Sequence, residues 1–190
     1  LRVTAHRLKK IIVDAGLPAH DYINIKKGIY RWDGPMPTEV DAHYFTELNK
    51  KVQSCTDKEE KLSLLKQMCL LYRGEFLPEL SGDEWILIES VLYKNLYSEA
   101  LRELCELLIE RGDYEETLRF CEPACKMYPF DEWQAVRIDC YMALNRYKDA
   151  LQEYENTAKL FFEELGIRPS ERTVCQSGMR CILGSLPLRF

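Results

Sequence analysis

Basic side chains gather in the first 33 residues of the chain. This segment holds seven lysines or arginines and three aspartates, a charge of +4, whereas the remainder holds 19 basic and 28 acidic residues, a charge of −9. Lysine and arginine neutralise the backbone phosphates of nucleic acids and release counterions, which gives affinity without base reading. The sequence therefore predicts that the N-terminal segment contacts a polyanion and that the acidic remainder serves another purpose.

The basic residues surround a short apolar stripe. Leu1, Ala5, Leu8 and Ile12 recur at helical spacing, which predicts an amphipathic helix over residues 1–12. A helix in the major groove reads base edges with arginine and touches phosphates with lysine. The candidate DNA-binding side chains on this helix are Arg2, Thr4, His6, Arg7, Lys9 and Lys10. The same pattern also fits a basic helix that faces only solvent.

A β-hairpin is expected directly after this helix. Residues 22–32 contain two short alternating runs around Gly28, which predicts two strands joined by a tight turn. Lys26 and Lys27 would then stand at the hairpin tip, where they can touch the minor groove or the DNA backbone, although an ordinary hairpin would look the same. A turn at Asp33-Gly34-Pro35 marks the expected end of this unit.

Four glutamates follow a helical spacing farther along the chain. Glu99, Glu103, Glu106 and Glu110 fall on one edge of a predicted helix. They form a candidate docking stripe for a basic protein surface such as that of RNA polymerase, or simply a solvated face. The chain has no phosphate-binding glycine loop, nucleophile elbow or paired carboxylates in a predicted cleft, so we expect no enzyme.

The eight cysteines do not form a metal-binding pattern. No Cys-x-x-Cys occurs, and the three histidines lie far upstream of most of the cysteines, so we expect neither a metal site nor a cofactor. Cys105, Cys121 and Cys140 fall where packed helices need small core residues, and buried thiols are the expectation there. The environments of Cys175 and Cys181, in the last predicted helix, stay open.

From Val40 onward the sequence predicts helices almost throughout. We place them at residues 41–54, 58–72, 83–110, 114–127, 131–143, 147–164 and 170–181, separated by glycine and proline. A repeat supports this arrangement: the set Tyr114, Thr117, Cys121 and Ala124 returns 33 residues later as Tyr147, Ala150, Tyr154 and Thr157. This period is typical of tetratricopeptide units, so the predicted fold class is all-α, a tetratricopeptide-like solenoid of helix hairpins.

The tyrosines of the repeat have two interpretations. Tyr114, Tyr147 and Tyr154 are expected to pack between helices, although some of them could instead line a groove that holds a peptide.

The order of short motifs resembles one known family. Val40-Asp41-Ala-His-Tyr-Phe45, Leu71-Tyr-Arg-Gly-Glu-Phe-Leu-Pro78, Trp85, and Glu164-Leu-Gly-Ile-Arg-Pro-Ser170 follow one another as in the bacterial transcriptional activator domain of SARP-type regulators. That resemblance covers about residues 40–180 and implies a tetratricopeptide-like module that acts in transcription.

In such regulators an OmpR-type winged helix precedes the module. Residues 1–10 resemble its recognition helix and Tyr22–Trp32 its wing, but the strands and helices that come earlier in a winged helix have no counterpart. With Leu1 as its first residue, the chain is therefore expected to be a fragment of a longer protein, whose upstream part could include a receiver of the two-component signalling type. The predicted organisation is a partial winged helix at 1–34, an activator domain at 35–182 and a tail at 183–190.

Two functions follow as alternatives. In the first, the protein is a cytoplasmic transcription activator that binds double-stranded promoter DNA and RNA polymerase. It could also form a homodimer, and we expect no contact with a membrane. In the second, it is a tetratricopeptide scaffold or signalling adaptor that does not bind DNA. Salt dependence separates them, because affinity for DNA falls steeply as salt rises.

Overall fold

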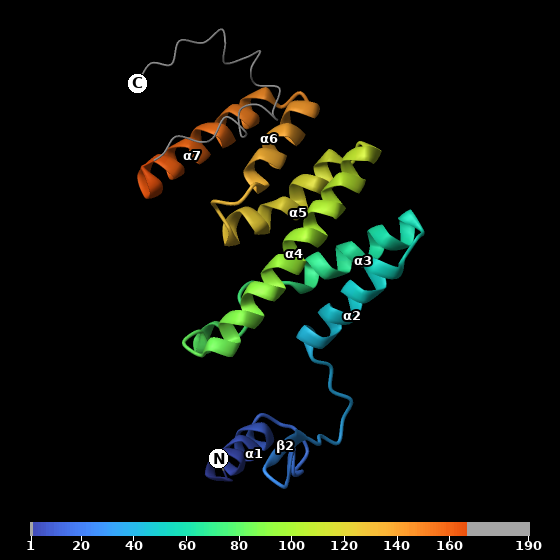
Figure 1. Ribbon diagram of the computed structural model, residues 1–190, viewed down its shortest axis with the longest axis vertical. Coiled ribbons are helices and arrows are strands. Elements are labelled where there is room, and N and C mark those ends of the chain that lie inside the picture. The colour runs from blue at the N-terminus through green and yellow to red at the C-terminus, as the bar shows by residue number, and fades with distance from the viewer. Residues whose placement is uncertain (1, 167–190) are drawn as a thin grey trace. The chain divides into compact units, whose positions relative to one another are not determined.

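The computed structural model describes residues 2–166 of the chain, which divides into two compact units (Figure 1). The N-terminal unit covers Leu1–Tyr44, and the helical unit begins at Phe45. The Trp32 indole donates a hydrogen bond of 2.8 Å to Thr38 Oγ1, which lies beyond the turn at Gly34. The seventh predicted helix, at residues 170–181, lies outside the described residues.

The N-terminal unit consists of one helix and one hairpin. Helix α1 (Arg2–Asp14) precedes strands β1 (Ile23–Lys26) and β2 (Ile29–Trp32), which pair antiparallel with Ile23 opposite Trp32. The two-residue turn is Lys27-Gly28, and both residues have positive φ (52° and 80°), as a type I′ hairpin turn requires. The helix followed by a hairpin agrees with the sequence prediction.

Tyr22 is the one fully buried hydrophobic residue among the described side chains of residues 3–44, at 1% exposure. Its ring lies 5.3 Å from that of Trp32, and its hydroxyl donates a hydrogen bond of 2.5 Å to the carbonyl of Pro18. By contrast Val3, Ile11 and Ile29 are more than 60% exposed. The N-terminal unit therefore has a small core and a large apolar surface.

The helical unit is built from helices that follow one another closely. Its elements are α2 (Asp41–Ser54, which starts just before the unit), α3 (Lys58–Leu71), the 3-10 turn η1 (Pro78–Leu80), α4 (Glu84–Arg111), α5 (Tyr114–Met127), α6 (Trp133–Ala143) and α7 (Tyr147–Leu165). From α3 onward, each α-helix packs mainly on the next, as in stacked helix hairpins (Figure 1).

The ends of α4 and α6 confirm the 33-residue repeat. Gly112 N donates to Ile109 O and Asp113 N to Leu108 O, at 3.0 and 2.9 Å. The same two bonds recur 33 residues later from Asn145 and Arg146, at 3.0 and 2.8 Å. Gly112 and Asn145 both adopt the left-handed conformation that closes a helix in this way. The hairpins α4–α5 and α6–α7 are therefore equivalent units, and the predicted all-α fold class is confirmed.

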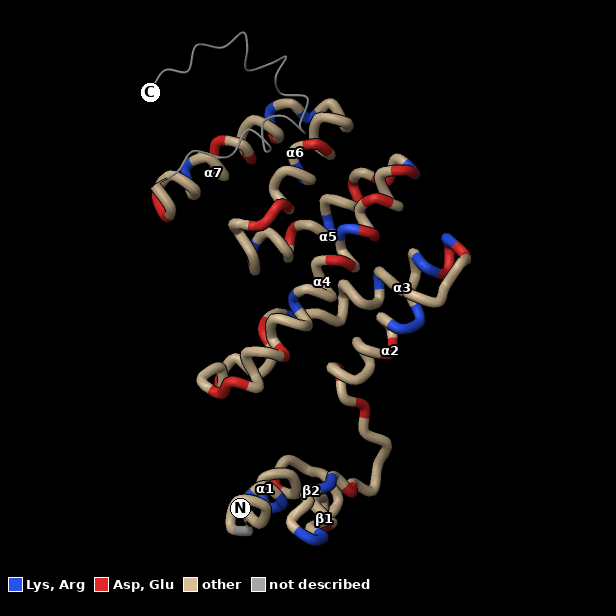
Figure 2. Tube along the Cα trace, in the orientation of Figure 1, with Lys and Arg blue, Asp and Glu red and all other residues tan. Residues whose placement is uncertain are grey.

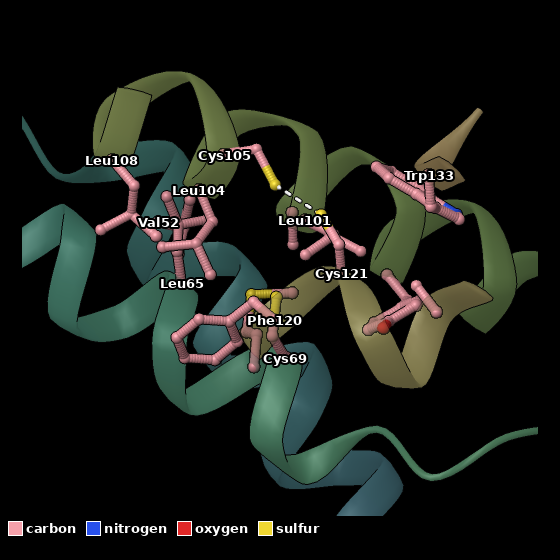
Figure 3. Close-up of a cluster of buried hydrophobic side chains, with 14 of the residues drawn as sticks. Val52, Leu65, Cys69, Leu101, Leu104, Cys105, Leu108, Phe120, Cys121 and Trp133 are labelled. Carbon is pink, nitrogen blue, oxygen red and sulfur yellow. Dashed lines mark hydrogen bonds between the residues drawn. The ribbon is translucent and has the colours of Figure 1, made fainter. Parts of the chain in front are cut away.

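The main core lies where α2, α3, α4 and α5 meet (Figure 3). Val52, Leu65 and Leu104 are at most 2% exposed there, and Phe120 of α5 packs with them. Burying such side chains contributes roughly 1.5–3 kcal/mol each. A smaller cluster around Ile138 and Ala150 joins α6 to α7. Pro123 lies within α5, which is assigned as one continuous helix from Tyr114 to Met127.

Candidate functional sites

The basic side chains of α1 are mostly open to water. Thr4, His6, Arg7 and Lys10 are exposed, as a DNA-contacting helix requires. Lys9 differs from them because it is half-buried and forms an ion pair with Asp21. This contact lowers the pKa of the Asp21 carboxyl, chiefly through the hydrogen bond from Lys9. Arg2 begins α1.

Two further cations stand at the tip of the hairpin. Lys26 ends β1, Lys27 occupies the turn, and both are exposed. In Figure 2 the trace is blue at this end of the hairpin, beside the β1 label. The N-terminal unit therefore carries exposed positive charge on its helix and on its hairpin. Exposed lysines and arginines at such positions can neutralise phosphates with little desolvation cost.

The four glutamates of the predicted docking stripe do not share one environment. Glu103 forms an ion pair with Lys61 of α3, and Glu110 forms another with Lys58, at 3.0 Å. Within the described part of the chain, Glu99 and Glu106 have no such pair. Half of the stripe therefore holds α3 against α4, which leaves two carboxylates for a partner. Docking through this stripe stays a prediction.

The cysteines form part of the core, as expected. Cys105 and Cys121 are at most 3% exposed, and their sulfur atoms lie 3.5 Å apart between α4 and α5 (Figure 3). Cys140 is 1% exposed, and burial raises the pKa of its thiol to about 12. Among residues 2–166 no three His, Cys, Asp or Glu side chains converge to hold a metal ion. Cys175 and Cys181 lie outside the described residues.

The repeat tyrosines differ in burial, which corrects one expectation. Tyr114 and Tyr154 are half-buried, and Tyr154 packs against the small cluster of Ile138 and Ala150, but Tyr147 is 53% exposed. Tyr147 is the first residue of α7, and its hydroxyl donates a hydrogen bond of 2.7 Å to Asn145 Oδ1 instead of entering the core.

One feature of the helical unit was missed in the sequence. A cavity of about 360 Å³ lies between α4 and α6, and its lining residues are Arg102, Cys105, Glu106, Ile109, Glu132, Trp133, Val136 and Asp139. These lining residues recur at intervals of three and four along each helix, at positions 102, 105, 106 and 109 and at positions 132, 133, 136 and 139. Each set therefore lies on one face of its helix. That periodicity was a usable signal, but only the stacking of the two hairpins brings the faces together.

Comparison with known families settles the class of the helical unit. Residues 40–176 match the model of the bacterial transcriptional activator domain, which is more than half of the chain. The chain belongs to this family. The resemblance to the activator domain that the sequence motifs suggested is thereby confirmed.

The activator-domain protein also has a similar solved structure. It aligns with Mycobacterium tuberculosis EmbR, solved in complex with a low affinity phosphopeptide, at 20% sequence identity and a TM-score of 0.58. The alignment covers 99% of this chain and 51% of the EmbR chain, so the activator-domain protein spans about half of EmbR's length. At this identity the similarity shows the fold. The search of curated proteins gave no match. Within residues 2–166, no helix combines the length and apolar character that crossing a bilayer demands.

Proposed function

We propose that this chain is part of a cytoplasmic bacterial transcription activator with two working surfaces. The N-terminal unit holds double-stranded promoter DNA, and the helical unit contacts RNA polymerase or a second protomer. The observation that carries the proposal is a basic helix with a lysine-tipped hairpin directly before an activator domain. The proposal keeps the predicted division into residues 1–34, 35–182 and 183–190.

On DNA, α1 acts as the recognition helix of a winged helix. Arg7 and the other exposed side chains of its first two turns read bases or contact phosphates, while Lys26 and Lys27 contact the backbone beside the groove. Lys9 contributes less than Lys10, because its ammonium group is already paired with Asp21. Binding to DNA and to polymerase at once raises the effective concentration of polymerase at the promoter, so activation needs no catalytic step.

The N-terminal unit exposes apolar side chains on which other parts of a winged helix could pack. Ile11 of α1 is 64% exposed and Ile29 of β2 is 63% exposed, which is unusual for a stable unit. We infer that further parts of a winged helix pack on these residues in a longer protein.

Fluorescence anisotropy tests the DNA surface. A labelled promoter-like duplex is titrated with this chain, and with a version extended upstream, at low and moderate salt. We expect binding that weakens steeply with salt, stronger for the extended chain. Failure of both chains to bind would refute the DNA surface.

The scaffold alternative rests on a specific observation too, since α4–α5 and α6–α7 are equivalent helix hairpins. It predicts capture of protein partners without DNA affinity. Immobilised chain is therefore also incubated with purified RNA polymerase. Retention of polymerase together with DNA binding supports the activator, whereas protein capture alone supports the scaffold.

A further inference from the structure

The cavity between α4 and α6 carries an excess of negative charge. Its lining includes three carboxylates, Glu106, Glu132 and Asp139, against the one guanidinium of Arg102. Arg102 is already engaged, because its Nε and Nη2 atoms donate to Glu132 Oε1 at 3.0 and 2.7 Å. Within the described residues, this leaves Glu106 and Asp139 without a hydrogen bond or ion pair. The cavity therefore holds two carboxylates whose charge no neighbouring cation balances.

Asp139 differs from an ordinary surface carboxylate. Its side chain is partly buried, and this burial raises its pKa to about 6. No nearby cation offsets the loss of hydration, since burial is the one resolved influence on this group. A carboxylate kept partly from water without a partner is unfavourable, and a cationic ligand would relieve the cost.

A second polar group on the cavity wall also lacks a partner. Trp133 is 1% exposed, and its indole Nε1 is buried without an acceptor in the part of the chain that the structure describes. An indole N–H can only donate a hydrogen bond, so it requires an oxygen or nitrogen acceptor. Trp133 lines the cavity beside the carboxylates, so a ligand carbonyl that reached its indole N–H would supply the missing acceptor.

These features together point to one kind of occupant. We propose that the cavity between α4 and α6 binds an arginine side chain presented by a partner protein. The inference deepens the proposed function, because it rests on the helical unit contacting a protein. A planar guanidinium can donate to both free carboxylates and is less strongly hydrated than an ammonium group. The peptide carbonyls around an arginine supply the acceptor that Trp133 lacks, whereas a free polyamine supplies none.

The size of the cavity suits this ligand. About 360 Å³ lies at the lower end of the range for small-ligand pockets, which holds one extended side chain and adjacent backbone rather than a helix. Val136 and Ile109 provide apolar walls for the methylene groups of the arginine. Because one cation enters a partly enclosed acidic site, binding will weaken with salt but remain measurable at physiological ionic strength.

The tryptophan indole signals offer a local readout of binding. The chain has three tryptophans, and the exposed Trp32 and Trp85 can be replaced by phenylalanine to assign the Trp133 signal by elimination. The ¹⁵N-labelled full chain is titrated with the peptide acetyl-Leu-Ala-Arg-Ala-Leu-amide. Control titrations use the same peptide with citrulline, which keeps the shape of arginine without its charge, and spermidine.

We expect a saturable shift of the Trp133 signal with the arginine peptide and at least tenfold weaker binding of the citrulline peptide. Asp139→Asn and Glu106→Gln should each weaken binding about tenfold. Glu84→Gln, at the start of the same helix and outside the cavity, should leave it unchanged. Equal binding of the citrulline peptide, no effect of either cavity variant, or preference for spermidine would each overturn the proposal. Because Glu106 is exposed, Glu106→Gln tests the site even if Asp139→Asn alters the fold.

The polymerase experiment separates this inference from the proposed function. If the full chain retains polymerase and Asp139→Asn retains it equally, the arginine site is refuted while the activator function stands. If the arginine peptide binds but polymerase is not retained, the site is supported and the polymerase contact is refuted.

Discussion

Arg137 of α6 and Glu153 of α7 form an ion pair whose Nη1 and Oε1 atoms lie 3.2 Å apart. Less than a fifth of each side chain is exposed, and Arg137 also donates a hydrogen bond of 3.0 Å to the hydroxyl of Tyr141. The ion pair joins the two helices of the second hairpin, where the apolar cluster around Ile138 is small. The hairpin therefore depends on a charged contact more than the main core does.

Removing one partner of this pair should destabilise the protein. Glu153→Ala leaves the Arg137 charge partly buried and unpaired, so we expect a loss of about 2–3 kcal/mol in the free energy of unfolding. Glu122→Ala breaks the exposed pair with Lys126 and should cost much less, because solvent screens that pair. Urea denaturation measures both. Equal effects of the two variants would show that burial of the Arg137–Glu153 pair is unimportant.

Asp139 should make stability depend on pH in a defined direction. Its pKa in the folded chain, about 6, exceeds the ordinary value of 3.8, so the folded state binds this proton first. The cost of the buried charge is thus fully present above pH 6 and is relieved as pH falls toward 4. At pH 7.5 we expect Asp139→Asn to raise Tm by a few degrees, about 1 kcal/mol after allowance for its partial exposure.

The comparison of Tm between wild type and Asp139→Asn is repeated at pH 4.5, where the difference should shrink. Because other carboxylates lose ion pairs in acid, only the difference between the two proteins is informative. A Tm gap that is constant from pH 7.5 to 4.5 would contradict the role given to burial.

The buried thiols should resist alkylation in the folded protein. Burial raises the pKa of Cys69 and Cys140 to about 12, so almost no thiolate exists there at pH 8. Iodoacetamide followed by peptide mass spectrometry should find both cysteines unmodified in buffer and fully modified in urea. Rapid modification of either cysteine without urea would show that the helices separate readily in solution.

The turn after α4 gives a prediction that uses the repeat. Gly112 has φ of 79°, so Gly112→Ala should cost about 1 kcal/mol although no atom lies within 4 Å of the added Cβ. Gly112→Asn should cost less, because Asn145 adopts the same conformation at the equivalent position. Gly82→Ala, at a glycine without positive φ and with equal space, is the control. Thermal unfolding in which both alanine variants behave alike would refute the explanation.

Much of the fold could be predicted because its signals are local. Residues 41–54 and 114–127 were predicted as helices with the bounds that the structure gives α2 and α5, since apolar spacing and flanking turn residues are written in the same segment. The Lys27-Gly28 turn was predictable for the same reason. The short turn η1 was missed, because three residues carry too little pattern to identify.

The parts of the sites that depend on packing could not be predicted. Arg102 and Asp139 are distant in sequence and line one cavity only because α4 and α6 are neighbours in the stacked hairpins. Likewise nothing local distinguishes Glu103, which pairs with Lys61, from Glu106, which faces the cavity. Lys9 shows the same limit, since its ion pair with Asp21 follows from how the chain returns beside α1.

The central claim is that the exposed cations of α1 hold DNA phosphates, and the salt dependence of affinity tests it most directly. The slope of log K against log salt is measured by anisotropy for the upstream-extended chain and for its Arg7→Glu, Lys10→Glu and Lys148→Glu variants, with the fold checked by circular dichroism. We predict that Arg7→Glu and Lys10→Glu abolish binding or reduce the slope by at least about 1, because each removes a phosphate or base contact. Lys148→Glu, in α7, should leave the slope unchanged. Equal affinities and slopes for all four proteins would contradict the account.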